Sequence, residues 1–163
     1  MDQALRAART ATNDEKKIKE ILDRAGEMVR KIPMNSSPPQ TGEMIYQLVR
    51  EVTGIGDPYE KIKKGHIGEA LRLYPELKKK IHSSDDRLVT AIRIAIAGNV
   101  IDLGVNRSFD LIRDINEVLD LDFAVYDIRP FRQAREKARS ILYLGDNSGE
   151  SVFDRILIEE MGK

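Results

Sequence analysis

Residues 141–161 read ILYLGDNSGESVFDRILIEEM, and this stretch decides how we interpret the rest of the chain. Its first four residues, 141–144, are apolar or aromatic side chains of the kind that suit a buried strand. Residues 145–149 have the small and polar composition of a turn. Apolar residues then recur at helical spacing from Val152 to Met161. The stretch therefore predicts a strand, a tight loop and a helix.

The loop of this predicted unit carries residues that could bind a ligand. Open α/β folds bind ligands where a strand ends and a helix begins, and the N–H groups of the helix start favour an anion there. Asp146, Asn147 and Glu150 add oxygen donors that suit a hard divalent cation holding a phosphate. No Lys-Ser or Lys-Thr pair follows the glycines, so the loop is not a P-loop. Capping of the helix by Asn147 or Ser148 explains the same residue types without a ligand, and this alternative stays open.

A second group of polar residues lies near the end of the most hydrophobic predicted helix, residues 88–103. Asn99 and Asp102 are three positions apart and therefore share one face of that helix. In such apolar surroundings they are expected either to satisfy neighbouring backbone groups or to line a site. Gly98, beside them, would allow another backbone or a ligand to approach closely.

Composition narrows the function classes. The 27 basic and 27 acidic residues cancel, which gives no electrostatic case for binding nucleic acid or an anionic membrane. The absence of cysteine excludes disulfides and thiolate metal sites, and the 33% of charged residues is typical of thermophilic proteins. No apolar stretch is long enough to span a bilayer, and the N-terminus has no apolar signal core. We therefore expect a soluble, cytoplasmic protein.

The predicted elements do not make a complete sheet. Apolar periodicity indicates about seven helices, one strand at 141–144 and a possible second strand or a connector at 123–126. We expect Gly65 and Gly68 to break or loosen one of the helices. A single strand cannot satisfy its own backbone groups. The fold class is thus mainly α: a helical domain, 1–120, leads into the first strand–loop–helix of an incomplete, apparently truncated α/β (Rossmann-like) domain, 121–163.

Three stretches resemble a known family. GDNSGE, followed after Ser151 by Val-Phe-Asp, resembles the Asp-Asn-x-Gly-Glu signature of the damage-control phosphatases. RIAIAGNVIDLGV at 93–105 and QALRAARTATNDE at 3–15 are also similar to that family. The resemblance therefore runs in order over nearly the whole chain.

The resemblance implies a metal-dependent phosphatase that hydrolyses small phosphate esters, either phosphosugars or damaged phosphometabolites. The cofactor would be a divalent Mn, Co, Ni or Mg ion. The resemblance also assigns roles to residues of this chain. Asp146 and Glu150 would be catalytic residues, and Asp146 and Asn147 would be metal ligands. The substrate side would carry Asn99, Asp102, Ser148 and Gly149.

Family members continue with an α/β half that supplies a further metal-binding Asp, so this chain alone would be incomplete. We expect a missing C-terminal half or a second chain to complete the sheet. Two other hypotheses about its function stay open: the chain is a non-catalytic helical interaction module, or it is an inactive fragment.

Overall fold

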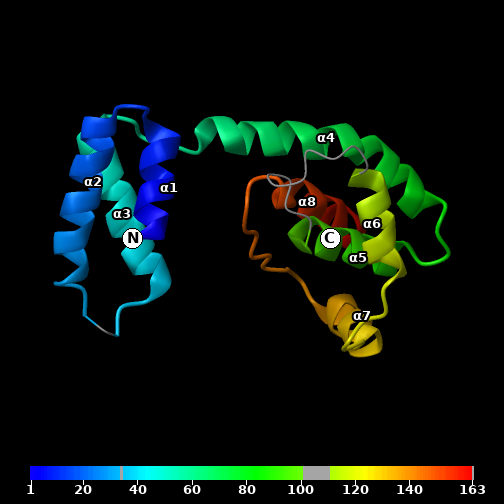
Figure 1. Cartoon of the computed structure of the whole chain (residues 1–163). Helices are drawn as coiled ribbons and strands as arrows, with labels where there is room; N and C mark the ends of the chain where they lie inside the picture. The colour runs from blue at the N-terminus through cyan, green and yellow to red at the C-terminus, as the bar shows by residue number, and fades with distance from the viewer. Residues whose placement is uncertain (34, 101–110, 163) are drawn as a thin grey trace. The chain divides into compact units, whose positions relative to one another are not determined.

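The computed structural model describes residues 1–33, 35–100 and 111–162, which are mainly helical and contain no strand (Figure 1). Their helices are α1 (Asp2–Ala11), α2 (Glu15–Val29), α3 (Pro38–Thr53), α4 (Glu60–His82), α5 (Arg87–Val100), α6 (Leu111–Asp120), α7 (Ile128–Lys137) and α8 (Glu150–Met161). The chain divides into two compact units, Met1–Lys61 and Ile62–Lys163. None of the described helices is long and apolar enough to cross a membrane.

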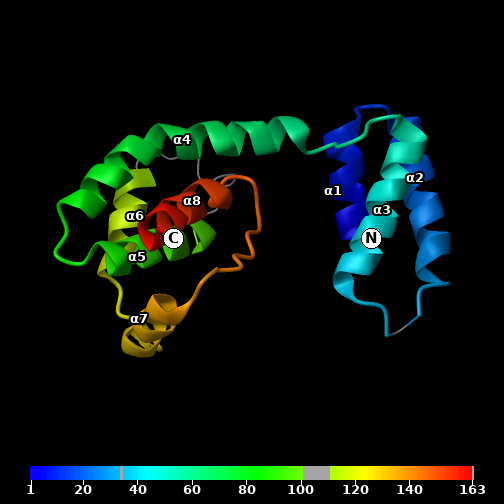
Figure 2. The ribbon, with the colours of Figure 1, turned by 180° about the vertical axis from the view of Figure 1, so that it is seen from behind.

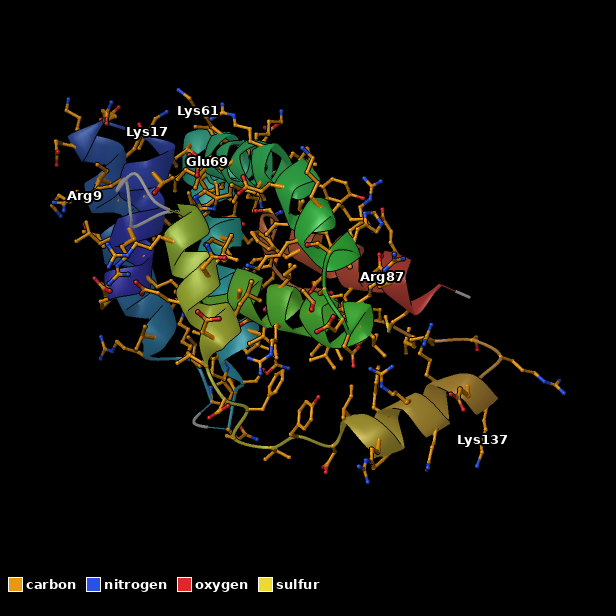
Figure 3. All side chains as sticks on the ribbon, turned by 90° about the vertical axis from the view of Figure 1, so that its right-hand side faces the viewer. Arg9, Lys17, Lys61, Glu69, Arg87 and Lys137 are labelled. Carbon is orange, nitrogen blue, oxygen red and sulfur yellow. The ribbon has the colours of Figure 1, made fainter. Side chains whose placement is uncertain are left out.

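The first unit consists of α1, α2 and α3, which pack on one another around a small apolar core. Three alanines of α1, Ala4, Ala7 and Ala8, are buried and allow the other two helices to approach closely. Asp14 caps α2 by accepting hydrogen bonds from the backbone N–H groups of Lys16 and Lys17. Charged side chains of this unit, such as that of Arg9, point outward from the helices (Figure 3).

The second unit is centred on α5 and α8, which lie against each other along their length (Figure 2). Their buried side chains form one apolar core with residues from α4 and α6. Phe153 of α8 is fully buried at its centre. Because α5 is apolar on most of its surface, it can be covered by α6 on one side and α8 on another.

Helix α4 runs without interruption through Gly65, Gly68 and Pro75, so the predicted break at the two glycines is wrong. Each glycine costs a helix only about 1 kcal/mol relative to alanine, and packing of the apolar face outweighs such a cost. The apolar residues Ala70, Leu77 and Ile81 of α4 are buried in the core of the second unit. Figure 1 shows α4 bending in its C-terminal half, which contains Pro75.

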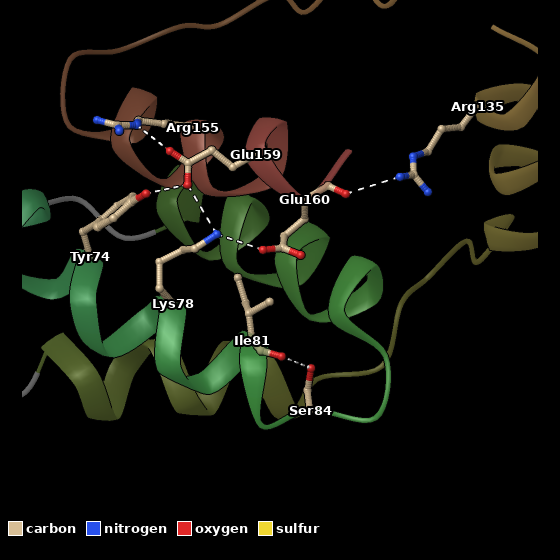
Figure 4. Close-up of polar contacts among 8 residues, drawn as sticks. All are labelled: Tyr74, Lys78, Ile81, Ser84, Arg135, Arg155, Glu159 and Glu160. Carbon is tan, nitrogen blue, oxygen red and sulfur yellow. Dashed lines mark hydrogen bonds and ion pairs between the residues drawn. The ribbon is translucent and has the colours of Figure 1, made fainter. Parts of the chain in front are cut away.

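A polar cluster joins α4 to α8 and α8 to α7 (Figure 4). The hydroxyl of Tyr74 donates to Glu159 Oε2 over 2.5 Å. Lys78 Nζ lies 2.8 Å from Glu160 Oε1 and 3.3 Å from Glu159 Oε2. The guanidinium of Arg135 on α7 donates to the main-chain carbonyl of Met161 at the end of α8. This cluster therefore fixes the C-terminal turn of α8 from two sides.

The predicted strand is not formed. Residues 141–144 belong to no helix or strand, and the side chains of Leu142 and Leu144 are 87% and 85% exposed. The physical reason is that the described residues supply no second strand to accept its backbone hydrogen bonds. The segment 123–126 is likewise a connector, in which Phe123 and Tyr126 stack on each other.

The predicted domain boundary at residue 120 does not coincide with the division between the compact units, which falls between Lys61 and Ile62. The reason is that α8, which follows residue 120, buries its apolar face on α5, which precedes it. Residues 121–163 therefore share a compact unit with preceding residues in this chain, and the domain division at residue 120 stays a prediction. That they begin an α/β domain stays a prediction.

Candidate functional site

The candidate site forms where α5 and α8 come closest. Gly98 of α5 is buried against Phe153 of α8, and a Cβ atom at Gly98 would lie only 2.6 Å from Phe153 Cγ. Gly98 does allow a close approach, but the group that approaches is a side chain of the neighbouring helix and not the backbone or ligand that was expected. This contact brings Asn99, the next residue of α5, beside the first turn of α8. There Asn99 Nδ2 donates to Glu150 Oε2 over 3.2 Å.

The loop before α8 is tied to the same carboxylate. Asn147 Nδ2 donates to Glu150 Oε1 over 3.0 Å. One carboxylate thus accepts amide protons from α5 through one oxygen and from the loop through the other. An ionised carboxylate has only acceptor positions, so Glu150 suits both partners at once.

Capping does not account for the polar residues of this loop. The N-cap of α8 is Gly149, and no side chain caps the helix. The Asn147 side chain donates to Glu150, and its main-chain carbonyl accepts from the Ser151 N–H over 3.0 Å. Ser148 contributes its main-chain carbonyl, to which Ser151 Oγ donates over 2.6 Å. The alternative in which Asn147 or Ser148 caps the helix through its side chain is therefore wrong.

A surface cavity of about 410 Å³ opens beside this hydrogen-bond chain. One wall is apolar and the other carries polar groups; its lining residues are Ile92, Ala95, Ile96, Asn99, Tyr143, Leu144, Asp146, Glu150, Asp154 and Leu157. Three carboxylates and no Lys, Arg or His are among these described residues. An anion would be repelled by this lining unless a cation accompanied it.

Among the three carboxylates of the cavity, Asp146 has the fewest polar contacts. It is exposed, and its side chain makes no hydrogen bond or ion pair with a described residue. Asp154, by contrast, accepts a hydrogen bond of 2.6 Å from the hydroxyl of Tyr143. Burial of the phenol, this hydrogen bond and the negative charge of Asp154 together raise the pKa of Tyr143 well above its usual range.

The structure brings together most of the predicted site residues. Asn99, Asp146 and Glu150 line the cavity, and Asn147 is held at its edge through Glu150. Ser148 and Gly149 build the helix start and are not among the residues that line the cavity. Asp102 lies outside the described residues. The chemical roles assigned to all of them stay predictions.

Sequence reasoning missed Tyr143 and Asp154, although both lie in the stretch that it selected. Asp154 is four residues after Glu150 on a helix, a spacing that places the two carboxylates on one face. That spacing was the available signal. Within residues 1–33, 35–100 and 111–162, no three His, Asp or Glu side chains are placed to hold a metal ion together.

The chain is similar to proteins of known sequence and structure. Residues 1–163 match a family described as the damage-control phosphatase ARMT1-like domain. An uncharacterized protein of Methanocaldococcus jannaschii is 27% identical over 99% of this chain and 55% of its own length. A damage-control phosphatase of Archaeoglobus fulgidus is 30% identical over 94% of this chain and 54% of its own length.

Among solved structures, a DUF89 family protein of Pyrococcus horikoshii matches with a TM-score of 0.87 and 28% identity, over 98% of this chain and 56% of that one. The chain spans about half the length of the curated relatives that it matches. The family match covers every residue and agrees with the motif around Asp146. The chain therefore belongs to the damage-control phosphatase ARMT1-like domain family.

Proposed function

We propose that this chain supplies one half of the active site of a metal-dependent phosphatase that hydrolyses small phosphate esters, either phosphosugars or damaged phosphometabolites. The observation that carries the proposal is the hydrogen-bond chain from Asn99 through Glu150 to Asn147, beside the uncommitted carboxylate of Asp146. The family match and the similarity to the damage-control phosphatase of Archaeoglobus fulgidus support the reaction class.

The donor chemistry fits a hard divalent cation such as Mn, Co, Ni or Mg. Asp146 offers a carboxylate, and Asn147 can offer its amide oxygen because its Nδ2 is occupied by Glu150. A bound cation would polarise the phosphoryl oxygens and lower the pKa of an attacking water. Two such ligands do not complete a coordination sphere, so we expect the remaining protein ligands to come from residues beyond this chain.

The residues of the chain have separate tasks in this proposal. Glu150 holds Asn147 and Asn99 in place, which keeps the loop against α5. Asn99 and the start of α8 at Ser148 and Gly149 face the substrate side, where the positive end of the helix dipole favours a phosphate. Asp102 is proposed on the same side, from the family resemblance.

The missing partner in this proposal is an α/β segment that adds strands beside residues 141–144. Leu142 and Leu144 are apolar and almost fully exposed, which is unfavourable unless another surface covers them. A segment of about the remaining length of the relatives, in the same polypeptide or in a second chain, would pair with this backbone and bury both side chains.

A phosphatase assay on p-nitrophenyl phosphate, after removal of metal and with each of Mn, Co, Ni and Mg, tests the proposal. We expect little or no turnover from residues 1–163 and clear metal-dependent turnover from a form extended by the C-terminal half. In that form Asp146→Ala should abolish turnover and leave the helical circular dichroism unchanged, whereas the exposed Asp122→Ala should alter neither. Metal-dependent turnover that survives in Asp146→Ala would refute the metal assignment.

A non-catalytic interaction module is the second candidate. The observation that favours it is that no three metal-binding side chains come together among the described residues. It predicts that residues 1–163 bind the C-terminal half, added as a separate polypeptide, with high affinity, and that the extended form shows no turnover with any of the four metals.

A further inference from the structure

The side chain of Tyr143 points in the opposite direction from its two neighbours. Leu142 and Leu144 are exposed, whereas Tyr143 packs against the core of the second unit and donates its hydroxyl proton to Asp154. This alternation is that of an extended backbone, although no ladder holds the segment in place. Among its four residues, Tyr143 is the one that attaches the segment to α8 by a hydrogen bond.

Asp154 and Glu150 are one helical turn apart on α8, and both line the cavity. Each carboxylate holds one point of the loop. Glu150 holds Asn147 over 3.0 Å, and Asp154 holds Tyr143 over 2.6 Å. Asp146 lies between these two points and makes no hydrogen bond of its own with a described residue.

The loop backbone at Gly145 also passes near Asp154. A Cβ atom at Gly145 would lie 3.8 Å from Asp154 Oδ2, which is an ordinary contact distance. The carboxylate therefore lies near the residue that precedes Asp146, with room for little more than a methyl group between them.

We propose that Tyr143 and Asp154 are positioning residues: their hydrogen bond, acting with the one between Glu150 and Asn147, sets where the Asp146 side chain enters the cavity. The inference rests on the proposed function in so far as Asp146 is taken as a metal ligand. Asp154 on this view holds the loop and does not itself bind the metal or act as the base. A hydrogen bond to a charged group is among the stronger ones in proteins, so its loss should be measurable.

We call the hydrogen bond between Tyr143 and Asp154 the tether. Backbone ¹⁵N relaxation of the loop tests it in the metal-free chain. We expect the order parameters of residues 144–148 to fall below about 0.6 in Tyr143→Phe and in Asp154→Ala. Asp154→Asn retains an oxygen acceptor and should stay close to the parent protein. Tyr126→Phe, which removes an exposed hydroxyl from the same unit, is the matched control. Thermal melts that stay within a few degrees would show that the variants fold.

Mn²⁺ titration of the extended form then connects the tether to the site. We expect Tyr143→Phe and Asp154→Ala to weaken Mn²⁺ binding about tenfold, and Asp154→Asn to restore most of the affinity. If Asp146→Ala leaves Mn²⁺ binding unchanged, the proposed function fails, and the relaxation data still decide the tether. If Asp146→Ala abolishes binding but loop order and affinity in Tyr143→Phe equal those of the parent, the tether is refuted.

Discussion

Replacement of Gly98 by alanine tests the close approach on which the candidate site depends. The added methyl group would lie 2.6 Å from Phe153 Cγ, 2.7 Å from its Cβ and 2.9 Å from its Cδ2. Phe153 is fully buried, so its ring cannot move aside into solvent. The methyl group and the ring must separate by roughly 0.8 Å to reach the shortest ordinary contact, which in a densely packed interior means a shift of α8 relative to α5.

Two opposing effects set the size of the change. Alanine is preferred over glycine inside a helix by about 1 kcal/mol. Insertion of a methyl group into a well-packed core costs about 1–3 kcal/mol or more, and contact with a rigid aromatic ring lies at the upper end. We therefore expect Gly98→Ala to lower the free energy of unfolding by about 1–2 kcal/mol. For a unit of this size, that corresponds to a decrease in melting temperature of roughly 5–15 °C.

Urea unfolding followed by circular dichroism measures this difference, with Gly65→Ala as the matched control. Gly65 also lies inside a helix, but a Cβ atom there would meet nothing within 4 Å. The control should therefore gain up to about 1 kcal/mol. The reasoning is refuted if Gly98→Ala is stabilised to the same extent as the control. A shift of α8 should also weaken the hydrogen bond between Asn99 and Glu150, which NMR of the Asn99 side-chain amide would detect.

Three further outcomes are expected. Lys78→Met should cost about 1–3 kcal/mol of unfolding free energy, because it removes the ion-pair partner of the partly buried Glu160 and one of the partners of Glu159. The exposed Lys79→Met should change stability by less than about 0.5 kcal/mol, and urea titration distinguishes the two variants. The hydrogen bond from Tyr74, with those from Arg and Lys neighbours, holds the pKa of Glu159 below its usual range. The stabilisation by the ionised Glu159 carboxylate is present above its unfolded pKa and is lost as the pH falls through its folded pKa. The free energy of unfolding of Tyr74→Phe should therefore decrease less between neutral and acidic pH than that of the parent. Leu142→Ser should alter the unfolding free energy of this chain by less than about 0.5 kcal/mol, and a large loss would contradict the exposure of that side chain.

Local sequence signals predicted the helices well and the cap residues less well. The apolar periodicity of residues 18–32 corresponds to α2, which ends three residues earlier, at Val29, and that of residues 152–161 corresponds to α8. Asp14 caps α2, although Thr12 and Glu15 have the spacing of a capping box. Thr12 Oγ1 instead accepts from the Asp14 N–H, one step before the helix. Several polar residues compete for one cap, and their order depends on backbone geometry that spacing does not reveal.

The strand at 141–144 was not predictable in the same way, because a strand is a property of two segments. The sequence signal is the composition of the segment, and the inward and outward alternation around Tyr143 follows it. Backbone pairing depends in addition on a partner that the described residues do not contain. The candidate site shows the same distinction. Asn99 and Glu150 could be selected from their motifs, whereas their contact depends on the packing of Phe153 against Gly98.

That contact has a consequence for how the site assembles. The connection from Asn99 through Glu150 to Asn147 depends on two packed helices and a short loop, and none of it depends on the sheet. Addition of strands beside residues 141–144 would bury Leu142 and Leu144 but need not rearrange α5 and α8. On the proposed function, the part of the site contained in this chain can thus form before any strands are added, and those strands would bring further metal ligands to a loop that is already held in place. Such an order of assembly predicts that the Asn99 side-chain amide has the same chemical shift in this chain and in the extended, metal-free form.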